Sequence, residues 1–528
     1  MTGPAAAAAG APPRNPWLIA FLVAMASFME VLDTTVANVA LPHIAGGMGV
    51  TADEASWVVT TYLVANAIIL TVSHFLARLL GRRRFFLICL ATFTASSVAC
   101  GLAWNLGALL AFRTFQGLAG GGMVPLAQSI LADSFPPQKR GQAFSLFGIA
   151  VVTAPVVGPT LGGYLSDNFS WHWCFLINGP VGLFAIAMIG IHLPAHHQTE
   201  AERRAALEGG FDVVGFVLVA SSLAALELVL DRGLIDDWFD SAFIRGVAAT
   251  GTLAFLALIP WELRRANPLI DVRMVATRQF GSCLVVMLSA GAILLATTQF
   301  LPLLVQQQYG YTATWAGLAL SPGGFVTIPM MLVVGQLAGR VQPRWLIAAG
   351  ALVVAASMYG LTNIYGDLDF WYFVRSRLIL SLGLPLIFIP TLTASYNGVP
   401  KHRTDMASAL INAARNMGAS MGVAIGANVV ARREQFHQSR LVEHVVPSSP
   451  QYQETLRQVT DYFLAHGAHP AEAPRQAFAW IAGQVQAQAA LLAYVDLFHV
   501  LMLLSLVAAL LALSLRSVTL GGGPRGGH

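Results

Sequence analysis

The stretch WLIAFLVAMASFMEVLDTTVANVAL, residues 17–41, is a long, mostly apolar run that contains two carboxylates, Glu30 and Asp33. Its length predicts a membrane-spanning helix, because about 20 consecutive apolar residues cross the hydrocarbon core of a bilayer. A charged side chain at the centre of such a helix costs roughly 2.5–3.5 kcal/mol on insertion scales. Acids that are kept there are therefore expected to be paired, protonated or functional.

Glu30 and Asp33 stand three residues apart and lie on one face of the predicted helix. As anions they would repel each other, so one of them is expected to hold a proton near neutral pH. A buried acid of this kind can carry protons across the membrane. The structural alternative is that Glu30 forms a hydrogen bond or reaches the headgroups, while Asp33 caps a kink.

The rest of the chain has the same apolar character. Of its 528 residues, 56% are hydrophobic and only 11% are charged, and the mean hydropathy is +0.65. Soluble domains contain about 25% charged residues, so this composition predicts a polytopic membrane protein. The formal charge of +4 does not indicate nucleic-acid binding, because the Lys and Arg residues occupy short loops between apolar runs.

Neither the cysteines nor the histidines predict a metal site. Cys89, Cys100, Cys174 and Cys283 occur singly in apolar stretches, and the 13 His residues show no ligand spacing. We therefore expect no disulfide, no metal and no cofactor.

Apolar runs predict about fourteen membrane spans. They cover residues 17–41, 56–76, 85–103, 106–130, 143–165, 174–193, 213–231, 242–261, 280–304, 314–337, 345–364, 371–395, 405–431 and 495–515. The predicted organisation is an N-terminal tail (1–16), an N-terminal six-helix bundle (17–193), two extra transmembrane helices (213–261), a C-terminal six-helix bundle (280–515) and a Gly-rich C-terminal tail (516–528). The tail 1–16 lacks the charged start of a secretion signal, so we expect the first span to remain uncleaved.

The charges of the loops alternate and predict the orientation. One set of loops is rich in Arg and Lys, and the other is poor in them and richer in acids, such as Asp53, Glu54, Asp236 and Asp237. The positive-inside rule places the basic set in the cytoplasm. Both termini are then cytoplasmic, as an even number of spans requires.

Two loops repeat a pattern. HFLARLLGRRR begins at His74 and GQLAGRVQPRW begins at Gly335, so the second predicted span corresponds to the tenth. This predicts two parallel six-helix halves around a central site, which is a transporter design.

Residues 432–494, between the last two spans, are expected outside the membrane and are much longer than any other loop. Apolar residues recur there at helical spacing, at Tyr452, Leu456, Val459 and Phe463, so we expect amphipathic helices. Their apolar stripe either covers the protein's own bundle or binds a partner, and the sequence does not distinguish these alternatives.

The fifth predicted span contains glycines and prolines at close intervals. Gly158 and Gly162 allow another helix to approach closely, and Pro155 and Pro159 are expected to kink the span. Such a helix suits a pivot between two bundles, although ordinary small-residue packing explains the same pattern.

Arg113 lies in the fourth span, and a guanidinium cannot lose its charge, so inside a membrane it needs an anion. Glu30 and Asp33 are the expected partners. Because an acid beside a fixed cation binds a proton less readily, separating the pair would couple conformation to protonation. The alternative is that Arg113 lies near the outer headgroups or donates to backbone carbonyls.

A transporter of amphipathic compounds needs an apolar cavity with a few polar contacts. The candidates are aromatic or polar residues within spans of both halves: Phe28, Tyr62, Asn66, Gln116, Gln128, Gln299 and Phe300.

Several of these segments resemble one known family. The motifs LDTTVANVALP (32–42), RTFQGLAGG (113–121) and APVVGPTLGGYLSD (154–167) are similar to those of the fourteen-span drug:proton antiporters of the major facilitator superfamily, in particular the EmrB-like multidrug exporters. The resemblance extends from about residue 17 to the C-terminus.

The resemblance implies a proton-driven exporter of hydrophobic drugs in a bacterial inner membrane, working with a periplasmic membrane-fusion adaptor and an outer-membrane channel. By position, Asp33 is the motif acid and Arg113 the motif arginine. The antiporter motif comprises Gly148, Pro155, Gly158, Pro159, Gly162 and Gly163. One departure is that His74 and Arg78 stand where the superfamily pattern has Gly and Asp, so the usual charge relay at that loop is not expected.

Drug export has three alternatives. An exporter of one metabolite or siderophore would share these features. A membrane enzyme is disfavoured because no carboxylate or His cluster has catalytic spacing at one membrane face, and a channel because no filter loop is found.

Overall fold

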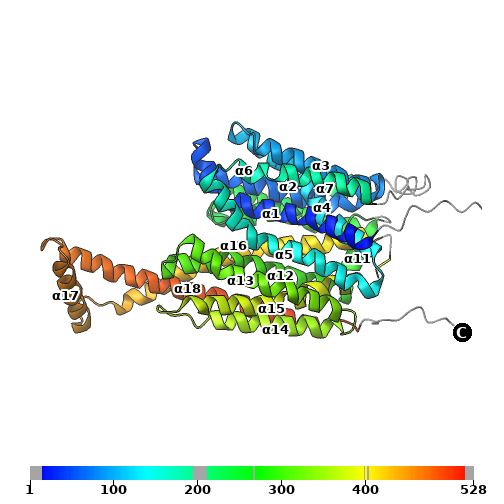
Figure 1. Ribbon diagram of the computed structural model, residues 1–528. Helices are drawn as coiled ribbons and strands as arrows, with labels where there is room; N and C mark the ends of the chain where they lie inside the picture. The colour runs from blue at the N-terminus through cyan, green and yellow to red at the C-terminus, as the bar shows by residue number, and fades with distance from the viewer. Residues whose placement is uncertain (1–14, 194–210, 266–267, 398, 401–402, 518–528) are drawn as a thin grey trace, which may run out of the picture.

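The computed structural model describes residues 15–193, 211–265, 268–397, 399–400 and 403–517, which form helices and no strand. Nearly all of the predicted tails, 1–16 and 516–528, therefore lies outside the described residues. The helices form one elongated bundle, with the N-terminal half above the C-terminal half in the view of Figure 1.

The N-terminal half consists of α1 (Pro16–Met48), α2 (Ala52–Leu80), α3 (Arg82–Cys100), α4 (Leu106–Ser134), α5 (Pro137–Asn168), the short α6 (Trp173–Leu176) and α7 (Asn178–His192). Local sequence sets several boundaries. Thr51 and Glu54 form a capping box at the start of α2, and Gly81, with φ of 82°, makes the turn into α3.

The two extra helices are α9 (Val213–Arg232) and α10 (Ala242–Arg264), joined through the short 3-10 helix η1 (Trp238–Asp240). Only 22% of the most apolar window of each is buried, so both present much of their surface to lipid. α9 packs against α10 and α2 and also touches α16.

The C-terminal half consists of α11 (Val272–Val275), α12 (Arg278–Tyr309), α13 (Ala313–Leu337), α14 (Pro343–Leu361), α15 (Phe370–Ser395), α16 (Thr404–His444), α17 (Pro450–Ala465) and α18 (Ala473–Leu513). Each predicted span falls on one long helix, except that residues 174–193 are divided between α6 and α7.

The two halves use the same packing plan. α1 packs against α5 and α2 against α4 in the first half, and α12 packs against α16 and α13 against α15 in the second. The halves meet where α5 contacts α13 and α15, and where α16 contacts α2 and α4. This arrangement confirms an all-α membrane protein built from two helical bundles.

Among the described residues, 11 helices are long and apolar enough to cross a membrane, or up to 12 if the bent α5 is counted as one span. α4 and α16 are the predicted spans outside this set. Both are rich in small and polar residues and pack inside the bundle, so they need less apolar surface. The predicted kink in α5 is confirmed, because its parts Gln138–Pro155 and Val157–Asn168 are bent by 41°.

The segment 432–494 extends away from the bundle. α16 and α18 continue past the other helices, and α17 lies across their far end (Figure 1). The interpretation that this segment covers the protein's own bundle is therefore wrong. The helical prediction is correct, but most of the segment consists of continuations of two membrane helices rather than a separate helical pair.

Candidate functional site

A fully buried ion pair joins α1 to α4. Arg113 Nη1 donates to Asp33 Oδ2 at 2.6 Å, and both side chains are completely excluded from solvent. This geometry agrees with the expectation that Arg113 needs an anion inside the membrane. The partner is Asp33 and not Glu30.

Three further polar groups complete this site: two side-chain amides and one backbone carbonyl. Gln116 Nε2 and Asn178 Nδ2 donate to Asp33 Oδ1 at 2.9 and 2.8 Å, and Arg113 Nε donates to the carbonyl of Val58 at 3.0 Å. The ring of Tyr62 lies 4.4 Å from the guanidinium carbon. The Asp33 carboxylate thus accepts hydrogen bonds from Arg113, Gln116 and Asn178, and a buried ion pair needs such partners.

Glu30 occupies a different environment, although it is close in sequence. Its Oε1 accepts a hydrogen bond from Asn66 at 3.2 Å, whereas its Oε2 is buried without a hydrogen-bond partner among the described residues. Arg415 of α16 is close enough to interact with it electrostatically. Glu30 is therefore held by Asn66 of its own half and is within electrostatic range of α16 in the other half, whereas the partners of Asp33 all belong to its own half.

The glycines of α5 do not have the position expected of a pivot between bundles. A Cβ added at Gly158 would lie 2.7 Å from Thr35 Cβ, and one at Gly162 would lie 3.1 Å from Val36 Cα. Both contacts are with α1, within the same half. The prediction that these two glycines lie between the two bundles is wrong. The spacing of the glycines shows that α5 has a face of small residues, but it does not show which helix packs against that face.

Two other glycines of α5 do face the second half. A Cβ at Gly148 would lie 3.0 Å from Met331 Sδ, and one at Gly141 would lie 2.6 Å from the carbonyl of Gly335. Ser145 between them donates to the carbonyl of Met331 at 2.6 Å. The N-terminal part of α5, which precedes the kink, is therefore the part that packs closely against α13. Gly163 is less crowded, with Val39 Cγ1 at 3.9 Å.

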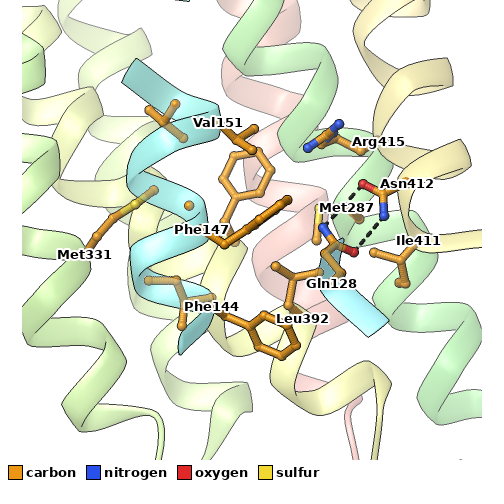
Figure 2. A pocket seen from close by; sticks show the side chains of 14 residues that line it. Gln128, Phe144, Phe147, Val151, Met287, Met331, Leu392, Ile411, Asn412 and Arg415 are labelled. Carbon is orange, nitrogen blue, oxygen red and sulfur yellow. Dashed lines mark hydrogen bonds between the residues drawn. The ribbon is translucent and has the colours of Figure 1, made fainter. Parts of the chain in front are cut away.

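A small pocket lies between the two halves (Figure 2). Its walls are mostly aromatic and aliphatic side chains of α5, α12, α13 and α15, including Phe144, Phe147, Met331 and Leu392. Gln128 and Asn412 meet at one side through reciprocal hydrogen bonds of 3.3 and 2.6 Å. An apolar cavity with a few convergent polar groups is typical of a binding site for hydrophobic ligands.

Of the seven predicted substrate-contacting residues, only Gln128 lines this pocket. The others lie elsewhere: Gln116 and Tyr62 at the Asp33–Arg113 pair, Asn66 beside Glu30, Phe28 against a neighbouring apolar cluster, Phe300 in the core and Gln299 at the exposed surface. Their contact with substrate stays a prediction.

Sequence reasoning missed two acids on the extra helix α9. Glu227 is buried and accepts a hydrogen bond of 2.6 Å from Ser420 of α16, while Asp231, one turn later, accepts one from Thr60 of α2. Within the described residues, Glu227 has no ion pair. α9 is therefore linked by polar contacts to both halves. The i,i+4 spacing of two acids in an apolar run was the available signal.

A second missed contact lies at the start of α3. Arg82 forms ion pairs with Asp133 at the end of α4 and with Asp405 at the start of α16. It therefore connects the two halves. The partner acids are 51 and 323 residues away, so spacing alone could not reveal them.

Comparison with known proteins agrees with this architecture. Residues 20–423 match the family model for the Major Facilitator Superfamily. The chain is 34% identical to the multidrug export protein EmrB of Haemophilus influenzae, over 91% of this chain and 92% of the relative. It is also 34% identical to the fatty acid resistance protein FarB of Neisseria gonorrhoeae, over 84% and 86%.

A structural likeness exists to the human organic anion transporter MFSD10, with a TM-score of 0.55 and 15% identity, covering 94% of this chain and 100% of that one. At this identity the likeness concerns the fold alone.

Proposed function

The chain belongs to the major facilitator superfamily and is similar to multidrug export proteins of the EmrB type. We propose that it is a proton-coupled antiporter that moves hydrophobic or amphipathic drugs out of the cytoplasm or inner leaflet by alternating access. It is a secondary transporter and not an enzyme. The proposed location is a bacterial inner membrane with both termini in the cytoplasm. In support, α1 begins and α18 ends at the same end of the bundle (Figure 1).

The Asp33–Arg113 pair is the observation on which proton coupling rests. While the pair is closed, the guanidinium neutralises the carboxylate. A movement of α1 relative to α4 would leave Asp33 in a low-dielectric interior without its cation, and uptake of a proton would then be favoured. Release of the proton from Asp33 would allow the Asp33–Arg113 pair to form again. Conformation and protonation would therefore change together.

The pocket between the halves is the proposed drug site. Its walls come from both halves, so rocking of one half against the other would open it to one side at a time. Gln128 and Asn412 could exchange their mutual hydrogen bonds for bonds to a bound drug. No cofactor is required in this scheme, because the proton gradient supplies the energy.

Purified protein in liposomes tests this function. An imposed pH gradient should drive a fluorescent drug such as ethidium against its concentration gradient, and the drug should in turn drive proton movement. Drug movement that is the same with and without the gradient would contradict proton coupling.

We further propose that the projecting segment 432–494 binds a periplasmic adaptor, which connects the exporter to an outer-membrane channel. The apolar stripe Tyr452, Leu456, Val459 and Phe463 is half-buried, in a helix that packs against α18, so it is not the binding surface. Exposed aromatic side chains are instead provided by Tyr462, Phe478 and Trp480. These are the candidates for contact with a partner.

Replacing residues 440–480 by a short Gly/Ser linker should leave pH-driven transport in liposomes largely unchanged and abolish drug resistance in cells. The paired change Phe478→Ser and Trp480→Ser should lower resistance in the same way without removing the helices. As a control, the exposed Gln458→Ser on α17 should have no effect. Survival of resistance in the linker variant would place adaptor binding elsewhere.

A further inference from the structure

We propose that a groove between α16, α18 and the connection from α9 to α10 binds an anionic glycerophospholipid of the surrounding bilayer, with the phosphodiester at Arg432. The groove has a volume of about 520 Å³. It shares no residue with the pocket of Figure 2 or with the Asp33–Arg113 pair. The inference therefore does not depend on the drug site or on proton coupling.

Two helices line the groove with stripes of the same spacing. The stripe on α16 is Ile425, Asn428, Val429 and Arg432, and the stripe on α18 is Asp496, His499, Val500 and Leu503. Each follows the pattern i, i+3, i+4, i+7, which places its members on one face of the helix. Arg433 of α16 and Trp238 of η1 complete the wall.

The groove changes from apolar to charged along its length. α16 runs away from the end of the bundle where α1 begins, and α18 returns toward that end (Figure 1). Ile425 and Leu503 therefore lie at the inner end of the groove, and Arg432 and Asp496 lie at the outer end. Seven residues separate the two ends on each helix, which corresponds to roughly 10 Å. This gradient matches a phospholipid, whose acyl chains lie deeper in the bilayer than its phosphate.

Arg432 provides a positive charge that the protein does not neutralise. Its side chain is exposed and forms no ion pair or hydrogen bond within the described residues. Asp496, the acid of the groove, is already engaged by Arg433 and by His437, whose Nε2 lies 2.7 Å from its Oδ2. The outer end of the groove therefore has one surplus cation.

Trp238 provides a second unused donor. Its indole Nε1 is buried and has no acceptor among the residues that the structure describes. Buried indole N–H groups usually have a hydrogen-bond partner. A phosphodiester carries one negative charge and two free oxygens, so it would satisfy the guanidinium of Arg432 and the indole together.

The depth of the groove favours a lipid over the other candidate occupants. Trp480, a proposed adaptor contact, lies 16 residues before Asp496 on α18, which is roughly 24 Å farther out. The side chains at the inner end, Ile425, Val500 and Leu503, are apolar and exposed, as at a surface that faces acyl chains. A cationic drug would be repelled by Arg432.

A lipid in this groove would connect parts of the two halves. Trp238 follows α9, which packs against α2 of the N-terminal half, whereas α16 and α18 belong to the C-terminal half. A lipid that touches both sides would bind best to the present arrangement of the halves and would stabilise it.

Native mass spectrometry of the purified full-length protein in a neutral detergent tests the proposal with three probes. Dioleoylphosphatidylglycerol has the chains and the phosphodiester, dioleoylglycerol has only the chains, and glycerol 3-phosphate has only a phosphate. The affinity of the first binding event is measured for the wild type, Arg432→Gln and Arg432→Lys. The matched control is Arg475→Gln, an exposed arginine of α18 outside the groove with no ion pair among the described residues.

The wild type should bind dioleoylphosphatidylglycerol at least tenfold more tightly than dioleoylglycerol and should not bind glycerol 3-phosphate at the same concentrations. Arg432→Gln should weaken binding of the phospholipid at least fivefold, Arg432→Lys should lie in between, and the control should equal the wild type. Because Arg432 is exposed, the melting temperature without lipid should be the same in all variants, and added phospholipid should raise it less in Arg432→Gln.

Three results would overturn the proposal through the probes: equal binding of the phospholipid and dioleoylglycerol, unchanged phospholipid binding in Arg432→Gln, or binding of glycerol 3-phosphate as tight as that of the lipid, which would indicate a site for free phosphate. Displacement of the phospholipid by ethidium would assign the groove to drugs. A wild type that binds no lipid, together with loss of drug resistance in cells that carry Arg432→Gln, would assign it to a protein partner. Either assignment would also overturn the proposal.

Discussion

Asp33→Asn is expected to abolish drug efflux driven by a pH gradient. The substitution keeps the shape of the side chain and removes the only group of the buried pair that can take up a proton. Gln116 and Asn178 can still approach the Oδ1 position, so drug binding should be retained. Without a titrating acid, the imposed gradient has no means of biasing the conformational change.

The same change leaves Arg113 as an uncompensated buried cation, and breaking a buried pair from one side costs about 3–5 kcal/mol. Loss of transport could then reflect loss of fold. The double variant Asp33→Asn with Arg113→Gln removes both charges and is expected to restore folding without restoring coupling. Gradient-driven efflux by the double variant, measured in liposomes, would show that Asp33 is not the coupling acid.

Glu30→Gln in the same assay determines whether the second acid takes part. Glu30 is within electrostatic range of Arg415 in the opposite half, and one of its carboxylate oxygens has no hydrogen-bond partner among the described residues. A variant that still transports, with a changed number of protons per drug, would assign Glu30 a secondary role.

Gly158→Leu is expected to remove both folded protein and efflux, because the new side chain would enter the space of α1. Even a Cβ at this position would lie 2.7 Å from Thr35 Cβ, nearer than side-chain carbons approach without movement of a helix. Overpacking of this kind costs about 1–3 kcal/mol and shifts the backbone. The measurements are the yield of monodisperse protein in detergent and the efflux rate per molecule.

Gly46→Leu on α1 is the matched control, since it adds the same atoms at an exposed helical glycine outside the antiporter motif, where a Cβ meets nothing within 4 Å. The milder Gly158→Ala should be rescued in part by Thr35→Gly, which removes the opposing Cβ. Normal efflux by Gly158→Leu would refute the tight α1–α5 contact, and failure of the rescue would assign the defect to another neighbour.

The sequence predicted the membrane class, the helices and the two-bundle plan because these depend on local properties. An apolar run long enough to cross a bilayer forms a helix whatever its neighbours are, since its backbone groups must be satisfied within the segment. The loop pattern at His74 and Gly335 likewise revealed the repeat that relates α2 to α13. The need of Arg113 for an anion also followed from its type and its surroundings.

Only the tertiary structure decided which groups meet, because the contacts join residues far apart in the chain. Asp33 and Arg113 are separated by 80 positions, and Glu227 and Ser420 by 193. Helical periodicity shows that a face is small or polar, but the neighbouring helix depends on how all the helices pack together. For this reason the sequence indicated a small face at Gly158 and only the fold placed α1 against it.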